Sequence, residues 1–494
     1  MGRNKLTVDF SAKHRGVSGS CIPVTINHPD GNIRFLVDFG SYLGEEEKLC
    51  EEEKSTGNKN YEPLDFSPGN LDFVILTHCH ADHNGRLPIL YKKQGKEKFQ
   101  RKPKEPYSGK IYTTVDTSNM LPIAMEDNEK IVRIYAKRKG IKPLYTSKEV
   151  EQVLSNTVPC EFGETFYPIP YRTDVKVTFY PNGHLVGAAI TLVQITCRGK
   201  EEGINILFTG DFKKDNIFFD VPELPEEVKR MPLYIVCEST YGATDTAQVV
   251  PVFNSNINRW LHEDKKTILI LSLSLERFQS TAYNLKVMQN SFLDRSIPIY
   301  FDGGLAIKYN NLYKYKLGIK ESMKDFMPDN STYVCDDMRK DIINGPEKKI
   351  IVATSGMGSF GPAQEYLPNL VERSDVGIHY TSYLSKDTTG YRMVNAEKEV
   401  LISSVFKRKI ADVQSTSEFS KHAKRDEMLE FLSQFPNIRG LFINHGEPDV
   451  QFQFAKYCQD NLELGENRIM LLSTGDTIRC NEYGWLKTFH NSVI

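Results

Sequence analysis

Short apolar runs recur along this chain, and the run at residues 71–76 is followed at once by a dense group of polar residues. The run is rich in β-branched side chains and begins after Gly69, which predicts a buried strand. A second apolar run covers residues 87–91, and Pro88 suits the first turn of a helix there. The polar residues between the two runs are therefore expected on a short loop at the end of a strand.

This loop carries four residues with metal-binding side chains, namely His78, His80, Asp82 and His83. His78 and His80 are two positions apart, so one loop can turn both imidazoles onto one ion. Asp82 and His83 are adjacent and would more easily serve a second ion. Zn²⁺ binds imidazole nitrogens and carboxylate oxygens at about 2.0–2.2 Å. The chain has 11 histidines, and three of them fall within six residues here, which favours a metal site over a polar surface turn.

The other apolar runs predict a mixed α/β protein. Turn residues bound the strands that we expect at residues 6–10, 21–26, 32–40, 175–180, 204–209, 233–238, 267–271, 297–301, 350–353, 440–444 and 469–472. The segment 116–160 has a mostly helical pattern. No apolar run approaches the roughly 18 residues that a membrane span requires.

Several further strand ends carry residues that could bind a metal. These are Asp38, His184, Asp211 and Glu238. Each has an ordinary explanation, because carboxylates cap turns and a loop histidine can simply hydrogen-bond its own loop. Together they place several potential ligands at strand ends, which is where α/β proteins commonly have their binding and active sites. Asp38 would either cap a turn or orient the metal loop, and the two roles are compatible.

Composition and charge narrow the class of protein. The 494 residues suggest two or three domains, and a hydrophobic fraction of 40% is ample for their cores. The start of the chain lacks the apolar core of a secretory signal, and the nine cysteines show no CxxC pair, which favours reduced thiols and a cytoplasmic location. The formal net charge is -2, so a polyanion would be met by a local groove, by metal ions or by both.

Two stretches of the chain are rich in charged residues. Residues 45–54 are expected to be a solvated helix or loop without chemistry. Residues 92–110 are rich in lysine and form either a solvated surface or a patch that contacts phosphates.

The order of the ligand-type residues resembles the signature of the metallo-β-lactamase fold. The matching positions are Asp38, His78, His80, Asp82, His83, His184 and Asp211. The resemblance implies an αββα sandwich with a metal site at one edge of its sheets. By analogy with di-zinc members, the implied ligands of one zinc are His78, His80 and His184. The implied ligands of the second are Asp82 and His83, and Asp211 is implied to bridge both.

The second half of the chain resembles the β-CASP family of ribonucleases within that fold, which includes the nuclease subunit of the cleavage and polyadenylation specificity factor and RNase J-like enzymes. Residues 238–242 resemble its motif A, residues 417–423 its motif B and residues 442–447 its motif C. Further landmarks of the inserted β-CASP domain are matched by residues 276–279, 302–306 and 356–363. The resemblance runs from about residue 10 to about residue 450, which is most of the chain.

The β-CASP motifs imply further site residues. Motif C adds His445 to the implied metal ligands. The implied substrate-binding residues are Arg277, Ser355 and Gly356. The chain departs from the family in two places, because Lys424 stands where aspartate is often found and Ser359-Phe360 where a glycine pair is common. The first departure concerns the surroundings of motif B, and the second concerns the shape of the substrate groove.

The motif order predicts the domain layout. Residues 1–238 and 414–494 would form the metallo-β-lactamase domain, and residues 239–413 would form an inserted α/β β-CASP domain. We expect neither the extra C-terminal domain of RNase J nor an added RNA-binding module before Leu6.

The resemblance implies a zinc-dependent ribonuclease. Two Zn²⁺ per chain would activate a water that hydrolyses phosphodiester bonds of single-stranded RNA, in an endonucleolytic or a 5′-to-3′ mode. The expected catalytic residues are Asp38, Asp82, Glu238 and His422. His422 would be the general acid, kept protonated by Glu238, although a histidine of a surface helix is the ordinary alternative.

Other functions of the same fold stay open. They are a single-stranded DNA nuclease, a metal-dependent hydrolase of a small ester, thioester or lactone, and an inactive scaffold that binds RNA or proteins. The long insertion and the late His422 and His445 argue against a small substrate, and the complete ligand set argues against an inactive scaffold. A net charge near zero favours a confined groove between the domains that admits one strand, and the histidine of motif C favours RNA by family resemblance. A homodimer is left open, and no membrane partner is expected.

Overall fold

The computed structural model describes residues 6–12, 16–44, 58–93, 104–197, 203–386, 388–465, 468–472 and 476–490. The chain divides into two compact units. Unit 1 comprises Met1–Asn216, Asp220–Thr246 and Lys421–Ile494, and unit 2 comprises Ile217–Phe219 and Ala247–Ser420. The domain boundaries inferred from the motifs, after residues 238 and 413, stay a prediction. The charged stretch at residues 45–54 lies outside the described residues.

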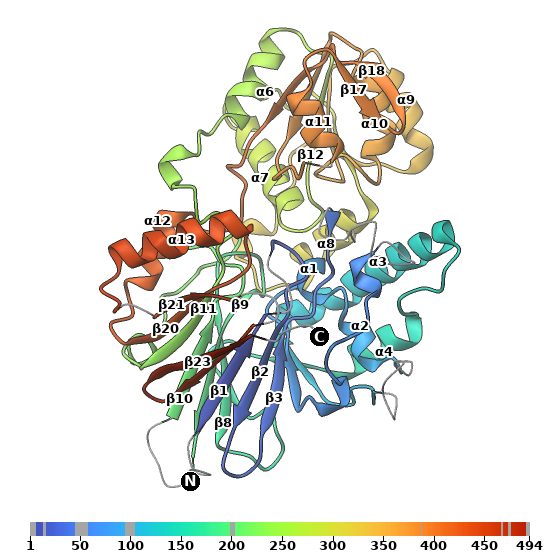
Figure 1. Ribbon diagram of the computed structural model, residues 1–494. Helices are drawn as coiled ribbons and strands as arrows, with labels where there is room; N and C mark the ends of the chain where they lie inside the picture. The colour runs from blue at the N-terminus through green and yellow to red at the C-terminus, as the bar shows by residue number, and fades with distance from the viewer. Residues whose placement is uncertain are drawn as a thin grey trace. The chain divides into compact units, whose positions relative to one another are not determined.

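Unit 1 contains two β-sheets (Figure 1). The eight-stranded sheet has the order β23-β22-β1-β2-β3-β4-β5-β6, and the seven-stranded sheet has the order β21-β20-β11-β10-β9-β8-β7. The strands of the first sheet are β1 (Thr7–Ser11), β2 (Ile22–Asn27), β3 (Ile33–Val37), β4 (Phe73–Ile75), β5 (Ile111–Thr114), β6 (Thr157–Cys160), β22 (Asp476–Asn481) and β23 (Gly484–His490). The strands of the second sheet are β7 (Thr165–Phe166), β8 (Val175–Pro181), β9 (Ala189–Thr196), β10 (Gly203–Phe208), β11 (Leu233–Cys237), β20 (Ile438–Ile443) and β21 (Ile469–Leu471).

Aromatic and aliphatic side chains of both sheets form one core between them. Phe35 of β3 stacks on Phe73 of β4 with ring centroids 4.8 Å apart, and Phe208 of β10 approaches Phe35 edge-on at 6.3 Å. Phe10 of β1 meets Phe442 of β20 at 4.7 Å. Buried and partly exposed residues alternate along β1 and β2, because each strand turns one face toward this core.

Helices cover the outer faces of the two sheets. The helices of unit 1 are α1 (Ala81–Asn84), α2 (Leu87–Tyr91), α3 (Val115–Lys139), α4 (Ser147–Asn156), α5 (Glu226–Lys229), α12 (Arg425–Leu432) and α13 (Pro448–Asn461). Met428 of α12 and Phe454 of α13 join Ile235 and Leu441 of the seven-stranded sheet in a second core. On the opposite side, α3 packs against β5, β6 and α4. The layers run helix, sheet, sheet, helix (Figure 1), which confirms the predicted αββα sandwich.

Unit 2 is an α/β structure built on a parallel sheet, as predicted for the insertion. The sheet has the order β14-β13-β15-β12-β16-β19. Its strands are β12 (Thr267–Leu271), β13 (Ile299–Asp302), β14 (Ser331–Tyr333), β15 (Lys349–Ala353), β16 (Val376–Tyr380) and β19 (Asp412–Ser415). A separate hairpin joins β17 (Glu399–Ile402) and β18 (Val405–Arg408).

The helices of unit 2 are α6 (Phe253–His262), α7 (Arg277–Gln289), α8 (Gly304–Tyr315), α9 (Arg339–Asn344), α10 (Ala363–Leu370) and α11 (Thr389–Asn395). The strands β12, β15 and β16 are buried along their whole length, as expected where helices cover both faces of a parallel sheet. Within the described parts of the chain, the helices are either too short or too polar to cross a bilayer.

Candidate metal centre

Asp38 ties the metal loop to the neighbouring strand. Because β3 and β4 are parallel neighbours, Asp38 and the loop after Ile75 leave the same edge of the sheet. The backbone N–H and the hydroxyl of Thr77 each donate to the Asp38 carboxylate at 2.8 Å. His83 donates from Nδ1 to the same carboxylate at 2.7 Å. With Nδ1 engaged, Nε2 is the nitrogen of His83 that is left for an ion.

Asp82 and His83 lie on a one-turn helix, so the prediction of a loop is wrong for these two residues. The helix α1 begins directly after His80, and the backbone N–H groups of His83 and Asn84 both donate to the His80 carbonyl at 3.0 Å. The carbonyls of α1 also accept backbone N–H groups from distant segments, namely those of Ser20, Phe39 and Ser41. The turn therefore rests on long-range hydrogen bonds, which the local sequence pattern does not encode.

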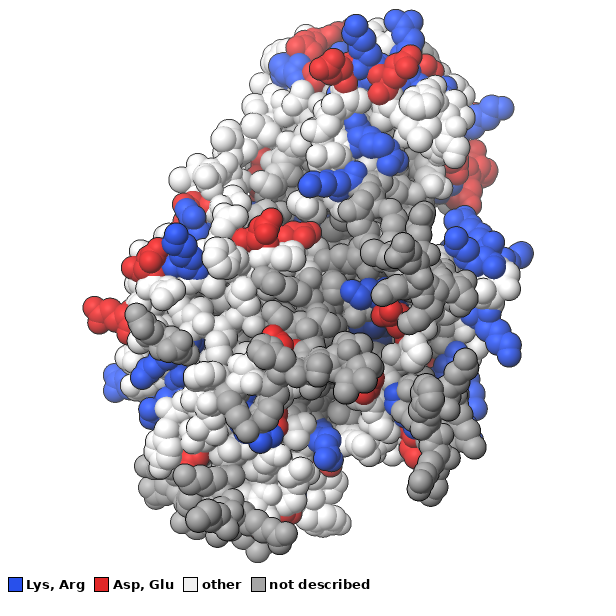
Figure 2. All heavy atoms as spheres, viewed as in Figure 1, with Lys and Arg blue, Asp and Glu red and all other residues white. Residues whose placement is uncertain are grey.

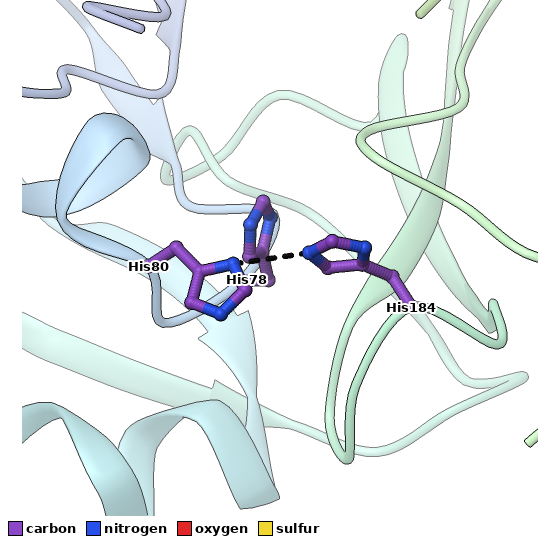
Figure 3. A group of neighbouring side chains, drawn as sticks. All are labelled: His78, His80 and His184. Atoms are coloured by element: carbon purple, nitrogen blue, oxygen red, sulfur yellow. Dashed lines mark hydrogen bonds between the residues drawn. The ribbon is translucent and has the colours of Figure 1, made fainter. Parts of the chain in front are cut away.

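Three histidines form the first group of ligand atoms. His78 and His80 leave the end of β4, and His184 lies in the connection between β8 and β9. Figure 3 shows the three imidazoles converging. The Nε2 atom of His184 lies 3.0 Å from Nδ1 of His80, and the His78 and His184 ring centroids are 4.7 Å apart. His184 donates from Nδ1 to the carbonyl of Lys421 at 2.8 Å, which orients its Nε2 toward the group.

A second group of ligand atoms adjoins the first. It consists of Asp82, His83, Asp211 and His445. One oxygen of Asp211 lies 3.1 Å from Nε2 of His83 and 3.8 Å from Nε2 of His78, so this carboxylate lies between the two groups. Nε2 of His445 lies 3.8 Å from a carboxylate oxygen of Asp82. His445 has a φ of 47°, a left-handed conformation that is uncommon for residues other than glycine and that clusters at functional sites.

Several buried ligand atoms have no hydrogen-bond partner among the described residues, but their spacing is that of the ligands of a metal ion. In the described part of the chain, four of these buried atoms make no hydrogen bond, namely His78 Nε2, His83 Nε2, Asp211 Oδ1 and His445 Nε2. Leaving such atoms unsatisfied is costly, so native structures rarely do so without a reason. Donor atoms on a tetrahedral zinc ion lie about 3.4 Å apart, given bonds of about 2.1 Å. The nitrogen–oxygen separations of 3.1–3.8 Å fit this spacing, so the donor set fits zinc in both groups.

The electrostatics of the two groups differ. Burial lowers the pKa of His78 and His184 well below the ordinary histidine value and lowers the pKa of His80 to about 4. These three imidazoles are therefore uncharged at neutral pH, which is the form that binds metals. Burial also acts against a charge on His83, but the carboxylates of Asp211 and Asp38 outweigh it and raise the pKa of His83 well above the ordinary value.

We expect metal binding to the second group to depend strongly on pH. Because the pKa of His83 is raised, a proton occupies this imidazole in the metal-free site and must leave when an ion binds. The affinity of the second group for Zn²⁺ should fall by about tenfold per pH unit for each proton released as the pH drops from about 8 to about 6. The affinity of the first group, which contains His78, should change little over that range, because the pKa of His78 is lowered and its imidazole carries no extra proton to release. Calorimetric zinc titrations at several pH values would measure both, and equal pH dependence at both sites would contradict the expectation.

His422 and Glu238 lie beside the metal groups. His422 donates from Nδ1 to Glu238 at 2.9 Å and lies with its ring centroid 4.7 Å from that of His184. Glu238 also accepts the backbone N–H of Phe212 at 2.7 Å, and the carbonyl of Phe212 accepts the N–H of Ala423 at 2.6 Å. Phe212, the residue after Asp211, is thus bonded through its N–H to Glu238 and through its carbonyl to the residue after His422. His422 also lies within ligand distance of His184 and Asp211.

The predicted substrate-binding residues lie in unit 2. Arg277 opens α7 shortly after β12, and Ser355 and Gly356 follow β15. Since β12 and β15 are parallel neighbours, all three residues lie at the same end of the sheet. The hydroxyl of Ser355 accepts the backbone N–H of Phe360 at 3.2 Å. Their contact with a substrate stays a prediction.

Several residues that shape the site carried no signal in the sequence. The backbone atoms of Phe212 and Lys421 hold Glu238 and His184, and a backbone contact is open to almost any residue type. Thr77 could have been recognised only by its place before the first histidine. Lys424 is buried, and its Nζ lies 3.2 Å from the ring centroid of Tyr241, so the departure from the family pattern provides a cation–π contact next to His422.

Three family models match the chain. The model of the metallo-beta-lactamase superfamily matches residues 17–149, and the Beta-Casp domain matches residues 271–393. A Zn-dependent metallo-hydrolase RNA specificity domain matches residues 408–470, which include His422 and His445.

Curated relatives are similar over most of the chain. The transcription termination factor FttA of Methanocaldococcus jannaschii is 27% identical over 91% of this chain and 68% of its own length. The FttA protein of Thermococcus kodakarensis is 28% identical over 77% of this chain but only 58% of its own length. The ribonuclease TTHA0252 of Thermus thermophilus is 26% identical over 86% of this chain and 90% of its own length. The chain thus spans nearly all of the ribonuclease and 58–68% of these two FttA proteins.

A solved structure of a protein of unknown function from Enterococcus faecalis V583 shares the fold. It has a TM-score of 0.55 and 11% sequence identity, and the match covers 96% of this chain and all of that chain.

Proposed function

Because the chain belongs to the β-CASP family of metallo-hydrolases, we propose that it is a zinc-dependent ribonuclease that hydrolyses phosphodiester bonds of single-stranded RNA. The observation that supports this most is the position of Asp211 between two groups of ligand atoms, beside the His422–Glu238 pair. The long insertion and the late His422 and His445 argue against a small ester as the substrate. Two adjacent groups and a separate proton carrier match the needs of phosphodiester hydrolysis.

Each residue of the site has a proposed role. His78, His80 and His184 would hold one ion, and the second group would hold another, with Asp211 shared. When bound, two zinc ions supply a nucleophile from water at neutral pH and neutralise charge on the phosphate. The carboxylate of Asp82, which is partly exposed, would accept a proton from the nucleophile, and Asp38 keeps His83 in one orientation.

His422 would supply the proton that the leaving oxygen needs. Its Nδ1 is engaged by Glu238, so Nε2 is the atom that could donate to a substrate. Such a hydrogen bond fixes both the tautomer and the direction of the ring, as catalysis by a positioned acid requires. We further propose that residues 1–238 with 414–494 and residues 239–413 are the two domains that carry these roles.

The relatives support RNA over other substrates. The Thermus thermophilus relative is named a ribonuclease, and the chain covers 90% of it. The model that matches residues 408–470 is described as an RNA specificity domain. Because the chain spans only 58–68% of the two FttA proteins compared, we carry over the ribonuclease activity and not transcription termination.

A substrate comparison tests the proposal. We expect metal-dependent cleavage of a single-stranded RNA to be faster than cleavage of DNA of the same sequence, and both to be faster than cleavage of a duplex. A site enclosed by protein admits one flexible strand more readily than a stiff double helix. End-labelled and internally labelled RNA would also separate endonucleolytic from 5′-to-3′ products.

The same assay separates the alternative functions. Nitrocefin and a generic thioester, each with and without chelator, probe the small-molecule hydrolases of this fold. Equal or faster turnover of the DNA would reject the preference for RNA. Turnover of a small substrate without any cleavage of RNA would reject the ribonuclease.

A further inference from the structure

The second half of α3 and the connection to α4 carry an unusual concentration of positive charge. The segment from residue 130 to residue 148 contains seven basic residues and no acidic residue, in a chain whose formal net charge is -2. The seven side chains are all exposed, and they are Lys130, Arg133, Lys137, Arg138, Lys139, Lys142 and Lys148. We call these seven residues the basic face. Figure 2 shows blue side chains without red ones among them at the right-hand edge of unit 1, where Figure 1 places the end of α3.

The helix is built so that this end stands clear of the core. Its first half buries Met120, Leu121, Met125 and Asn128, whereas Ala136 is the buried residue of its last three turns. Lys130, Arg133 and Lys137 follow one another at spacings of three and four residues, so they form a stripe along one side of the helix. Ile131 and Ile134 flank the stripe and are 57% and 39% exposed.

The described carboxylates balance little of the charge of the basic face. Among the described residues, Arg133 alone of the seven has a carboxylate within 4.0 Å, that of Glu129 at 4.0 Å. Unit 2 shows the opposite pattern, because Arg339 lies 2.7 Å from Asp336 and Lys407 lies 2.9 Å from Glu372. Figure 2 shows red and blue side by side at the top of the view, in unit 2.

Helix stability explains only part of this pattern. Basic side chains in the last turn, such as Lys137 and Lys139, interact favourably with the helix dipole. That effect fades within one turn, so it does not account for Lys130 or Lys148. Arg133 and Lys137 are moreover like charges four residues apart, an arrangement that destabilises a helix. A polyanionic partner would offset this repulsion.

The basic face differs from the lysine-rich stretch that the sequence pointed to. In that stretch, Lys92 donates to the carbonyl of Leu144 at 2.6 Å, and Lys110 donates to the side chain of Asn156 at 3.0 Å. These two lysines thus hold the α3–α4 region in place. Residues 94–103 of the stretch lie outside the described residues, so the predicted phosphate patch stays a prediction there.

The first half of α3, up to Asn128, is anchored beside the metal centre. The hydroxyls of Thr114 and Thr117 donate to the carbonyl of Gly187 at 2.6 and 2.9 Å, three residues after His184. Asn128 donates to the side chain of Asn84, the residue after His83, at 2.8 Å. A helix rises about 1.5 Å per residue, so Lys137, which follows Asn128 by nine residues, lies about 14 Å beyond it along the axis. At roughly 3.4 Å per nucleotide, that distance corresponds to about four nucleotides.

We propose that the basic face binds the sugar-phosphate backbone of RNA outside the metal centre, so that RNA longer than about four nucleotides is held at both places. This inference rests on the proposed ribonuclease function for the identity of the polyanion. The face supplies point charges without a pocket for bases, so the contact is independent of sequence and depends on salt.

A binding measurement on the full chain tests the proposal. The variant carries Lys130→Gln, Lys137→Gln and Arg138→Gln, since glutamine keeps a helix propensity close to that of lysine and arginine. The control carries Lys316→Gln, Lys340→Gln and Lys398→Gln, three exposed lysines of unit 2, and has the same net charge as the variant. Fluorescence anisotropy would follow a labelled 20-nucleotide single-stranded RNA in the presence of chelator, which prevents cleavage, at several salt concentrations.

We expect the variant to bind at least tenfold more weakly than the control at about 0.1 M salt, and its slope of log affinity against log salt to be smaller by about 2. That change corresponds to three phosphate contacts at about 0.7 each. Equal affinities and slopes for variant and control would overturn the proposal. Equal competition by polyglutamate and by unlabelled RNA of the same charge would also overturn it, in favour of an acidic protein partner.

A second readout separates this proposal from the ribonuclease itself. With metal present, the variant should show a raised KM and an unchanged kcat on the 20-nucleotide RNA, and normal kinetics on a 3-nucleotide RNA. Normal turnover of the short RNA also shows that the variant is folded. If no RNA is cleaved by any of the proteins, the ribonuclease fails, whereas the binding measurement still decides the basic face.

Discussion

Replacing His422 by alanine is expected to lower the rate of RNA cleavage by about 10²–10⁴-fold while both metal ions stay bound, the range found for general acids and bases. His422 has Nδ1 engaged by Glu238 at 2.9 Å, and its ring lies beside that of His184 at the metal centre. The loss should appear in kcat, because proton donation acts in the transition state. Single-turnover cleavage together with metal analysis would measure both quantities.

Two further variants sharpen this prediction. Glu238→Gln keeps the shape of the side chain but removes the charge that accepts the Nδ1 proton, so it should also reduce kcat with the metals retained. His262→Ala removes an exposed histidine at the end of α6 and should leave activity unchanged. Loss of zinc from His422→Ala would show instead that His422 is a ligand, which its distance to His184 and Asp211 permits.

The sequence predicted the parts of the site that are encoded locally. His78, His80 and His83 were found because three histidines after one buried strand are rare by chance. The strands were predicted from apolar runs, which alternate where one face is buried, as in β1, and are uniformly apolar where both faces are buried, as in β11. The αββα sandwich was implied by the family resemblance.

The site residues that are distant in sequence from the metal loop could be assigned to the site only by the family resemblance. His422 and His445 follow the first metal-binding histidine by more than 340 residues, and no spacing rule links them to it. Their position depends on β20 pairing with β11, and such long-range pairing is not written in any local pattern. The short helix α1 was missed for the same reason, since its carbonyls are held by N–H groups from residues 20, 39 and 41.

The basic face was missed for a different reason. Its charges are interleaved with Ile131, Ile134 and Ala136, and the sequence analysis predicted only a mostly helical segment at residues 116–160. Only the packing shows that the buried side of α3 ends near Asn128 and that the later turns face solvent.

The largest effect is expected from Asp211, because its carboxylate lies between both groups of ligand atoms. Protein purified without chelator should contain about two zinc ions per chain, the number that the two-metal mechanism requires. Asp211→Asn should lose at least one of them and lower RNA cleavage by at least about 10³-fold, since metal ions supply several kcal/mol of transition-state stabilisation.

The loss of metal should also lower the melting temperature, because an ion that binds only the folded state stabilises it. Asp211 is buried with His83 and His445 around it, so an amide there would leave those imidazoles without their negative partner. The matched control is Asp215→Asn, the same change at an exposed position of the same loop, which should keep two ions and full activity. Metal analysis, thermal melts and cleavage of labelled RNA on both variants would check the prediction. An active Asp211→Asn protein, or an active wild-type protein free of metal, would contradict it.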